Sequence, residues 1–332
     1  MAADVRSPFR IAGVRIPNRV VLAPMAGMTT SAFRRRAKAH GAGLVVTEMV
    51  SVYGLVYGDR RTRHYLEFQE EERPLALQLF GADPEAVARA VSIVIETDHP
   101  PDLIDLNMGC PVRKVMKTGA GAALLADPAR AQAVAAAAVR AAAPAGLPVT
   151  AKIRSGLQPG AEVAVEVARR LEDVGVAAVG VHPRAASQFY RGRADHQVTA
   201  AVAAAVGVPV LASGDVDGAA AARAILSMTG ASAVMVARAA QSGPWIIADI
   251  LDGKERGRRP LSEVVIELRT LLALAAEDMG AQRAARWSQK IVGWYLKGLG
   301  LSPATLDRLR TCPDSESLDA SLAALLDDSF SD

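Results

Sequence analysis

The hydrophobic positions of the chain fall into short apolar runs that recur at regular intervals between longer, alanine-rich stretches. The runs are rich in β-branched residues and nearly continuous in apolar character, which is typical of parallel strands covered on both faces. We therefore predict eight strands, at residues 20–23, 44–47, 75–80, 103–106, 149–153, 178–181, 208–212 and 233–236.

The stretches between these runs favour helices, because alanine has the highest helix propensity. Helices are predicted at residues 84–96, 128–142, 161–174 and 218–228. Strands that alternate with helices over about 250 residues fit an α/β fold of the (β/α)8 TIM-barrel type. A doubly wound sheet is the alternative, but no G-x-G-x-x-G motif follows the first strand.

The pattern changes near residue 252. Residues 252–260 are charged and interrupted by glycine and proline, which is typical of a linker. From residue 262 onward the pattern is helical, and residues 314–332 are acidic. We expect a barrel domain at residues 1–252, followed by a small all-helical domain at residues 253–332.

Composition narrows the class of protein. With 51% hydrophobic and 22% charged residues, the 332-residue chain has a globular composition. We expect no membrane span and no secretory signal, and hence a cytoplasmic protein. Two cysteines are too few for a disulfide framework. Neither belongs to a pair with metal-ligand spacing, so no metal site is predicted. The net charge of +3 permits an anionic partner without demanding one.

The strongest chemical candidate is Cys110, in the sequence Asn107-Met-Gly-Cys110-Pro111 after the fourth predicted strand. TIM barrels keep their catalytic groups at the C-terminal ends of the strands. A glycine and a proline shape this loop, so the thiol is expected at a fixed height from which it reaches a substrate. A lone cysteine is more often buried and inert, but the position at a strand end favours function.

Other strand ends carry weaker signals. The turn at residues 23–27 follows the first strand, and its backbone can approach a flat ring closely. Gln78 is a polar side chain within the apolar third strand and fits the core or a site equally well. Lys152 and Arg154 point to the same side of the fifth strand. A lysine inside a barrel is costly unless it meets an anion or an electron-rich group.

The last three strands end in His182, in Ser213-Gly214-Asp215 and in Ala237-Arg238. The loops after the seventh and eighth strands are the usual phosphate site of such barrels, because their backbone N–H groups and an arginine receive the anion. Each signal is weak alone. Together they place a site at successive strand ends.

These motifs resemble the tRNA-dihydrouridine synthases, most closely their bacterial B-type branch. The similar stretches are Ala-Pro-Met-Ala-Gly at 23–27, Glu48-Met49, Gln78, Asn-Met-Gly-Cys-Pro at 107–111, Gly-Ala-Gly at 119–121, Lys-Ile-Arg at 152–154 and residues 188–195, with Trp294 to Gly298 in the tail. The motif around Cys110 is specific to this family, whereas the flavin motifs are shared more widely.

The resemblance implies the reduction of a specific uridine in the D-loop of transfer RNA to 5,6-dihydrouridine. Reduced FMN would give a hydride to C6 of the uracil and Cys110 a proton to C5, while Asn107 and Arg154 hold the uracil edge. NADPH is the implied reductant of the flavin. The implied FMN ligands are Pro24, Met25, Ala26, Gln78, Lys152, His182, Ser213, Gly214, Asp215, Ala237 and Arg238.

The chain departs from the family pattern at three places. Ser213 stands where the family usually has asparagine, and Ala237 stands in place of a usual glycine. The methyl group of Ala237 is tolerable only if its φ is negative. His182-Pro183-Arg184-Ala185 replaces His-Gly-Arg-Thr, which changes the hydrogen bonding expected of that loop.

The tail offers its own indication of an RNA partner. On one continuous helix, Arg283, Arg286, Lys290 and Lys297 fall within about 60° of one face, a stripe that can track phosphates. The only acid between residues 281 and 310 is Asp307. The run Arg34-Arg35-Arg36 is predicted to be a solvated face. Three arginines of the second strand's loop fit RNA or solvent equally well: Arg60, Arg61 and Arg63.

Two other functions stay open at this point. A flavin barrel acting on a free pyrimidine, such as a dihydroorotate dehydrogenase, would share the flavin residues without needing a basic tail. A regulatory or RNA-chaperone protein could keep the barrel as a scaffold only. No protein partner is implied, and we expect a monomer.

Overall fold

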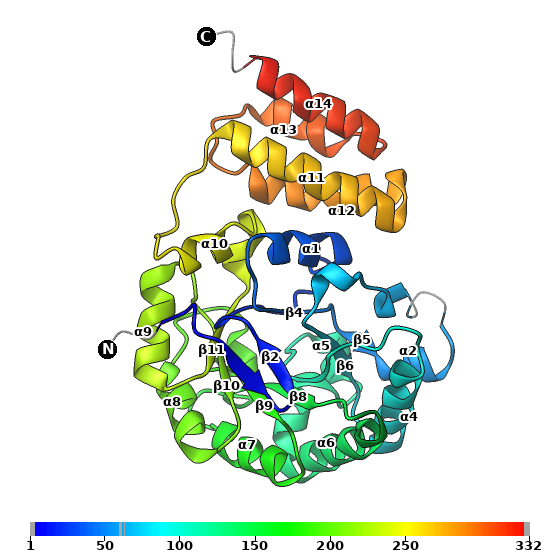
Figure 1. Cartoon of the computed structure of the whole chain (residues 1–332), viewed down its shortest axis with the longest axis vertical. Coiled ribbons are helices and arrows are strands. Elements are labelled where there is room, and N and C mark those ends of the chain that lie inside the picture. Colours follow the sequence, from blue (N-terminus) through cyan, green and yellow to red (C-terminus); the bar gives the residue numbers. More distant parts are fainter. Residues whose placement is uncertain (1–3, 60–61, 63, 329–332) are drawn as a thin grey trace.

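The computed structural model describes residues 4–59, 62 and 64–328. Its centre is a closed barrel of eight parallel strands, in which the pairing of β4 with β6 completes the ring (Figure 1). The barrel strands are β3 (Val20–Leu22), β4 (Leu44–Val46), β6 (Leu75–Phe80), β7 (Leu103–Met108), β8 (Val149–Arg154), β9 (Ala178–His182), β10 (Val210–Ser213) and β11 (Ala233–Val236). The predicted TIM-barrel fold and its strand positions are confirmed.

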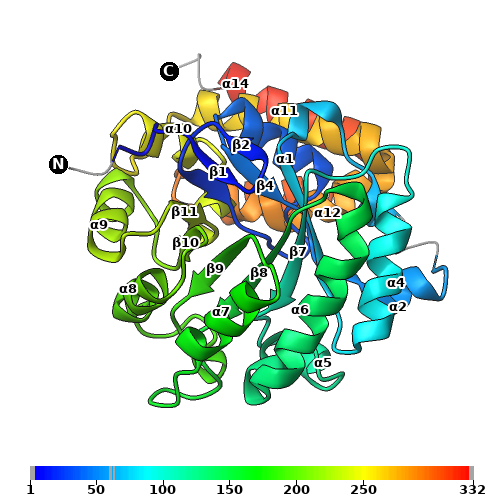
Figure 2. The ribbon, with the colours of Figure 1, turned by 60° about the horizontal axis from the view of Figure 1, so that its bottom comes forward.

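Helices cover the outside of the barrel (Figure 2). The longer ones are α1 (Ser31–Ala39), α4 (Pro84–Ile95), α6 (Pro128–Ala142), α7 (Ala164–Asp173), α8 (His196–Ala205) and α9 (Ala219–Thr229); α2 (Val52–Val56), α5 (Arg113–Met116) and α10 (Ile246–Leu251) are short. Asp83 and Asp127 cap α4 and α6 by accepting hydrogen bonds from N–H groups of the first turn. A proline at the first helical position follows each cap.

Alternation along the strands creates two apolar cores. One set of side chains packs against the outer helices, while residues such as Val21, Leu103 and Met235 form a separate cluster inside the barrel. The hairpin of β1 (Phe9–Ile11) and β2 (Val14–Ile16) adds Ile11 and Ile16 to this inner cluster. It was not predicted, because each of its three-residue strands has a central arginine and so forms no apolar run.

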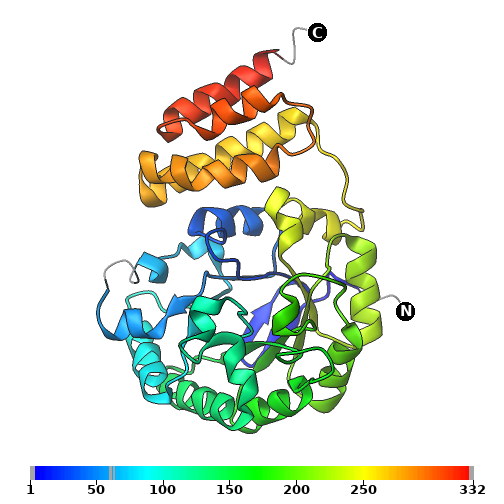
Figure 3. The same cartoon turned by 180° about the vertical axis from the view of Figure 1, so that it is seen from behind.

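The tail consists of α11 (Leu261–Met279), α12 (Ala281–Tyr295), α13 (Pro303–Arg310) and α14 (Ser315–Asp328). It packs beside α1 and α10 (Figures 1 and 3), and residues 254–260 join it to the barrel without regular structure. No helix among the described residues is long and apolar enough to cross a membrane.

The predicted solvated face at Arg34-Arg35-Arg36 is wrong. Arg34 is 4% exposed and pairs with Glu72 of the barrel. Arg35 pairs with Asp278 at 2.8 Å and Arg36 donates two hydrogen bonds to Glu267, both acids belonging to α11. These arginines lie at the junction between α1 and the tail, a proximity that one helix's own sequence does not reveal.

Candidate active site

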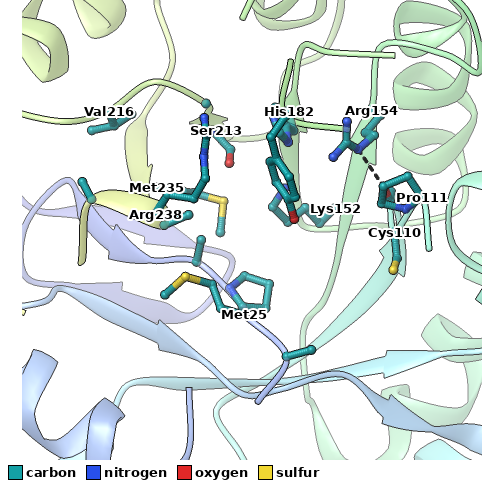
Figure 4. Close-up of a pocket in the computed structure, with 18 of the residues that line it drawn as sticks. Met25, Cys110, Pro111, Lys152, Arg154, His182, Ser213, Val216, Met235 and Arg238 are labelled. Carbon is teal, nitrogen blue, oxygen red and sulfur yellow. Dashed lines mark hydrogen bonds between the residues drawn. The ribbon is translucent and has the colours of Figure 1, made fainter. Parts of the chain in front are cut away.

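The C-terminal ends of the barrel strands surround a cavity of about 640 Å³. Every residue that we predicted to bind flavin or uracil within the barrel lines it. They are Pro24, Met25, Ala26, Gln78, Asn107, Cys110, Lys152, Arg154, His182, Ser213, Gly214, Asp215, Ala237 and Arg238. Figure 4 shows Cys110 on one side and Ser213 and Arg238 on the other, with His182 and Lys152 between them. We call these the thiol side and the phosphate side.

The Cys110 loop is fixed by hydrogen bonds at its start. The side-chain oxygen of Asn107 accepts from the Gly109 N–H at 3.2 Å and from the Cys110 N–H at 2.9 Å. Arg154 Nε donates to the Gly109 carbonyl at 2.9 Å, from the neighbouring strand β8. The thiol therefore stands on a backbone held by side chains of the adjacent strands β7 and β8.

Behind this loop runs a chain of buried polar side chains. Asn107 Nδ2 donates to Gln78 Oε1 at 2.9 Å, and Gln78 Nε2 donates to Asp105 Oδ2 at 2.7 Å. The hydroxyl of Thr150 donates to the other Asp105 oxygen at 2.6 Å. A carboxylate can only accept hydrogen bonds, so Asp105 fixes which end of the Gln78 amide donates. Gln78 in turn fixes the orientation of Asn107, whose side-chain oxygen then faces the Cys110 N–H.

Asp105 was missed in the sequence, where it lies within a predicted apolar strand. The signal was present, because side chains two apart on a strand share a face, and Asp105 precedes Asn107 by two residues. Asp105 is 6% exposed, and burial raises its pKa, against the effects of Thr150, Gln78 and Lys152. A buried acid with both oxygens partnered indicates a position with a specific role in the polar chain.

Lys152 projects into the cavity, and its ammonium group hydrogen-bonds to none of the described residues. Gly180 of the neighbouring strand leaves room for it, since a Cβ there would lie 3.3 Å from Lys152 Cγ. Burial and the nearby Arg154 lower the pKa of Lys152 to about 8, while Asp105 opposes the shift. The lysine is thus a half-buried cation that hydrogen-bonds to none of the described residues, which fits an electron-rich ligand.

The Cys110 thiol is half-buried, and burial raises its pKa. Arg154 and Lys152 act in the opposite sense. A raised pKa keeps the thiol protonated near neutrality, which suits a proton donor better than a nucleophile.

Arg154 is committed mainly to backbone. Besides the Gly109 carbonyl, it donates through Nη1 to the carbonyls of Ala185 and Phe189, at 3.1 and 2.8 Å. Its side chain is 3% exposed, and its Cζ lies 5.7 Å from the centre of the Tyr190 ring. The guanidinium therefore joins the Cys110 loop to the loop after β9 while it lines the cavity.

The phosphate side is built from tight backbone and ion pairs. Gly214 has a φ of 111° and Asp215 a φ of 54°, both in the left-handed region. The carboxylate of Asp215 binds the fully buried Arg184 at 2.7 Å and Arg238 at 3.1 Å. Arg184 had no predicted role, because nothing in its sequence context shows that Asp215 is its partner.

The two substituted positions fit this backbone. Ala237 has a φ of −123°, so its methyl group causes no strain, as we required of it. Ser213 is buried and lines the cavity where the family pattern has asparagine. Neither change closes the site.

His182 ends β9 beside Arg184, whose Nη1 lies 3.2 Å from His182 Nε2. Burial, followed by the surrounding cations, lowers the pKa of His182 far below its ordinary value. The ring is therefore neutral, and Nε2 accepts because the guanidinium can only donate. Tyr190 was not predicted. The centre of its ring lies 6.3 Å from the centre of the His182 ring and 5.1 Å from Arg238 Cζ.

The predicted tail residues lie apart from this cavity. Arg283, Arg286 and Lys290 are exposed on α12, but that helix ends at Tyr295, so Lys297 lies in the following turn. The prediction that Lys297 lies on the same helix as the other three cations is therefore wrong. Three arginines of the loop after β4 lie outside the described residues: Arg60, Arg61 and Arg63.

Comparisons with known proteins give a consistent result. A family model described as Dihydrouridine synthase (Dus) matches residues 21–327. The tRNA-dihydrouridine synthase B of Pseudomonas aeruginosa is 38% identical over 297 residues, covering 88% of both chains. That of Xanthomonas axonopodis pv. citri is 36% identical over 324 residues, or 96% of this chain and 95% of the relative.

Solved structures of low sequence identity share the fold over most of the chain. The old yellow enzyme homologue from Zymomonas mobilis matches with a TM-score of 0.56 at 13% identity, over 73% of this chain and 90% of that one. Identity at this level supports the shared fold and nothing finer.

Proposed function

Because the chain belongs to the dihydrouridine synthase family, we propose that it reduces a specific uridine in the D-loop of transfer RNA to 5,6-dihydrouridine. One observation supports this above all others. The Cys110 thiol, whose pKa burial raises, lies across one cavity from a loop pair suited to a phosphate. Lys152 lies between them and hydrogen-bonds to none of the described residues. This arrangement suits a flat anionic cofactor with a substrate base beside the thiol.

FMN fits the residues present. Arg238 and the tight Gly214-Asp215 turn would receive its phosphate, since both line the cavity and offer a guanidinium and backbone N–H groups. The turn Pro24-Met25-Ala26 and Gln78 would border the ring, with neutral His182 beside it. Lys152 would compensate negative charge on the ring. When bound and reduced, FMN supplies the hydride that is added to C6 of the uracil.

The chain's own residues complete the reaction. Cys110 donates its proton to C5, which balances the hydride added at C6 and leaves a thiolate. Lys152 and Arg154 favour that thiolate electrostatically, and solvent then reprotonates it. Asn107 holds the backbone on which the thiol stands, and Asn107 and Arg154 border the space for the uracil edge.

The remaining assignments rest on the same proposal. We assign NADPH as the reductant, acting in a separate half-reaction at the same open face of the flavin. Residues 1–252 form the FMN-binding barrel and residues 253–332 a helical tRNA-binding domain, in which Arg286, Lys290 and Lys297 face phosphates. Transfer RNA as the substrate implies a cytoplasmic enzyme, which we assign as a monomer.

The test uses purified, FMN-loaded protein with NADPH and either unmodified transfer RNA or free uridine. We expect dihydrouridine in the transfer RNA only, detected by mass spectrometry of the digested nucleosides. Turnover of free uridine alone would replace our substrate with a small pyrimidine. Protein that takes up no FMN would instead favour a barrel kept as a scaffold.

A further inference from the structure

A second cavity opens beside the catalytic one, between the barrel and the tail. Its volume is about 340 Å³, within the range of small-ligand sites. We call it the side crevice and define it by Gly27, Glu48, Tyr65, Arg283, Arg286 and Trp287. Barrel loops form one wall and α12 forms the other, so only the assembled two-part chain contains it.

One turn separates the side crevice from the catalytic cavity. Ala26 lines the catalytic cavity, and its neighbour Gly27 lines the crevice. The indole N–H of Trp287 donates to the Gly27 carbonyl at 3.1 Å, which fixes both the ring and the turn. The ammonium group of Lys290 stands over the same turn, 2.6 Å from where a Gly27 Cβ would be. A chain of consecutive nucleotides could therefore enter both cavities while passing Lys290.

The crevice is acidic at its floor and basic at its rim. Glu48 is buried and accepts a hydrogen bond from the Gly27 N–H. Arg283 and Arg286 are exposed, and neither forms an ion pair with a described residue. A free anion would meet the carboxylate at the floor. A nucleotide matches both parts, because its base is uncharged and its phosphates remain at the rim.

Aromatic surface is available for such a base. Tyr65 is 43% exposed and lies close enough to Glu48 and Arg283 to interact with them electrostatically. Trp287 supplies a second, half-buried ring. Proteins bind single-stranded RNA by stacking unpaired bases on exposed aromatic side chains.

We propose that the side crevice binds the unpaired nucleotide that adjoins the target uridine in transfer RNA. A uridine that enters a buried pocket must leave its stack, which exposes a face of the neighbouring base. Tyr65 and Trp287 cover that face, Arg283 and Arg286 bind its phosphate, and Lys290 binds the phosphate between the two nucleotides. This inference rests on the proposed function and adds a second recognition site to it.

The test compares Tyr65→Ala with Tyr65→Phe and with Tyr57→Ala in the FMN-loaded protein. Tyr57 is 80% exposed and does not line the crevice, so it is a matched control. We expect Tyr65→Ala to weaken binding of unmodified transfer RNA about tenfold, as loss of one stacked base does. Tyr65→Phe and Tyr57→Ala should bind as the parent does, and NADPH should reduce the flavin equally in all four proteins.

A direct readout follows the base itself. Transfer RNA carrying 2-aminopurine beside the mapped target uridine should lose fluorescence on binding to the parent and retain it with Tyr65→Ala. Unchanged affinity of Tyr65→Ala for transfer RNA, or an equal loss of affinity in Tyr57→Ala, would overturn the proposed role of the side crevice. Failure of the proposed function looks different, since the parent itself would then neither bind transfer RNA nor form dihydrouridine.

Discussion

The two sides of the catalytic cavity are built by different means. On the thiol side, neutral amides and one buried carboxylate run in a continuous hydrogen-bonded chain from Thr150 to Cys110. On the phosphate side, arginines and Asp215 form ion pairs around left-handed backbone. The first arrangement fixes geometry and the second supplies charge. Changes on the thiol side should therefore alter the rate, and changes on the phosphate side should alter cofactor affinity.

The largest effect is expected for Cys110→Ala. Removal of the proposed proton donor should slow dihydrouridine formation about 10³-fold, which is within the range of general acid catalysis. NADPH should still reduce the flavin at the parent rate in stopped-flow absorbance. Cys312→Ala is the matched control and should be fully active. Product formation at the parent rate in Cys110→Ala would assign the proton to another group.

Lys152→Met should have the next largest effect. It removes the unpaired cation that projects toward the proposed ring position, and we expect reduced flavin to react with transfer RNA about 10²-fold more slowly. In the parent, the lysine loses its proton as pH rises through its pKa of about 8. Negative charge on a bound flavin would move that midpoint upward. The parent rate should therefore fall at alkaline pH. A similar alkaline fall in Lys152→Met would remove the lysine from this role.

Asp105 tests whether the polar chain really orients the thiol. Asp105→Ala leaves the buried amide of Gln78 without an acceptor, so we expect about tenfold slower uridine reduction and a lower melting temperature. Asp105→Asn keeps an oxygen toward Gln78 and should recover most of the rate. FMN affinity should change little in either variant. Equal activity of the alanine variant and the parent would show that the Cys110 loop keeps its conformation without the Asp105 side chain.

The smallest effect is expected on the phosphate side. Arg238 is partly exposed and shares its charge with Asp215, so Arg238→Ala should weaken FMN binding about fivefold. Riboflavin lacks the phosphate and should bind equally to the variant and the parent, in fluorescence titrations. Arg258→Ala, an exposed change in the linker, is the control. Equal losses of affinity for riboflavin and FMN would show that Arg238 does not bind the phosphate.

Period-two alternation explains why so much of this cavity was predictable. Residues at the C-terminal ends of parallel strands converge on one mouth, so the sequence pattern places Asn107 and Lys152 together. Gln78 fitted the core equally well by pattern, and only the structure places it at the cavity. What failed was the identification of partners across the chain. Asp105 appeared to belong to an apolar strand, and Arg184 gave no sign of its pairing with Asp215.

The junction with the tail was the least predictable region. Three consecutive arginines resemble a solvated face unless the acids of a distant helix are known to oppose them. The side crevice was hidden for the same reason, because its walls are separated by more than two hundred residues in the sequence. Local patterns report which face of an element is buried, but not which element buries it.

The arginines of α1 have a further consequence for how the enzyme family could diversify. The same helix begins just after the turn at residues 24–27, part of which lines the cavity, and its Arg35 and Arg36 pair with α11. It therefore connects the cavity with the tail. Exchanging Glu267 and Asp278 of α11, which pair with these arginines, would change the orientation of the tail on the barrel without changing any residue of the cavity. A change of target nucleotide would then require only exchanges of charged residues at this junction, while the residues of the cavity stay the same.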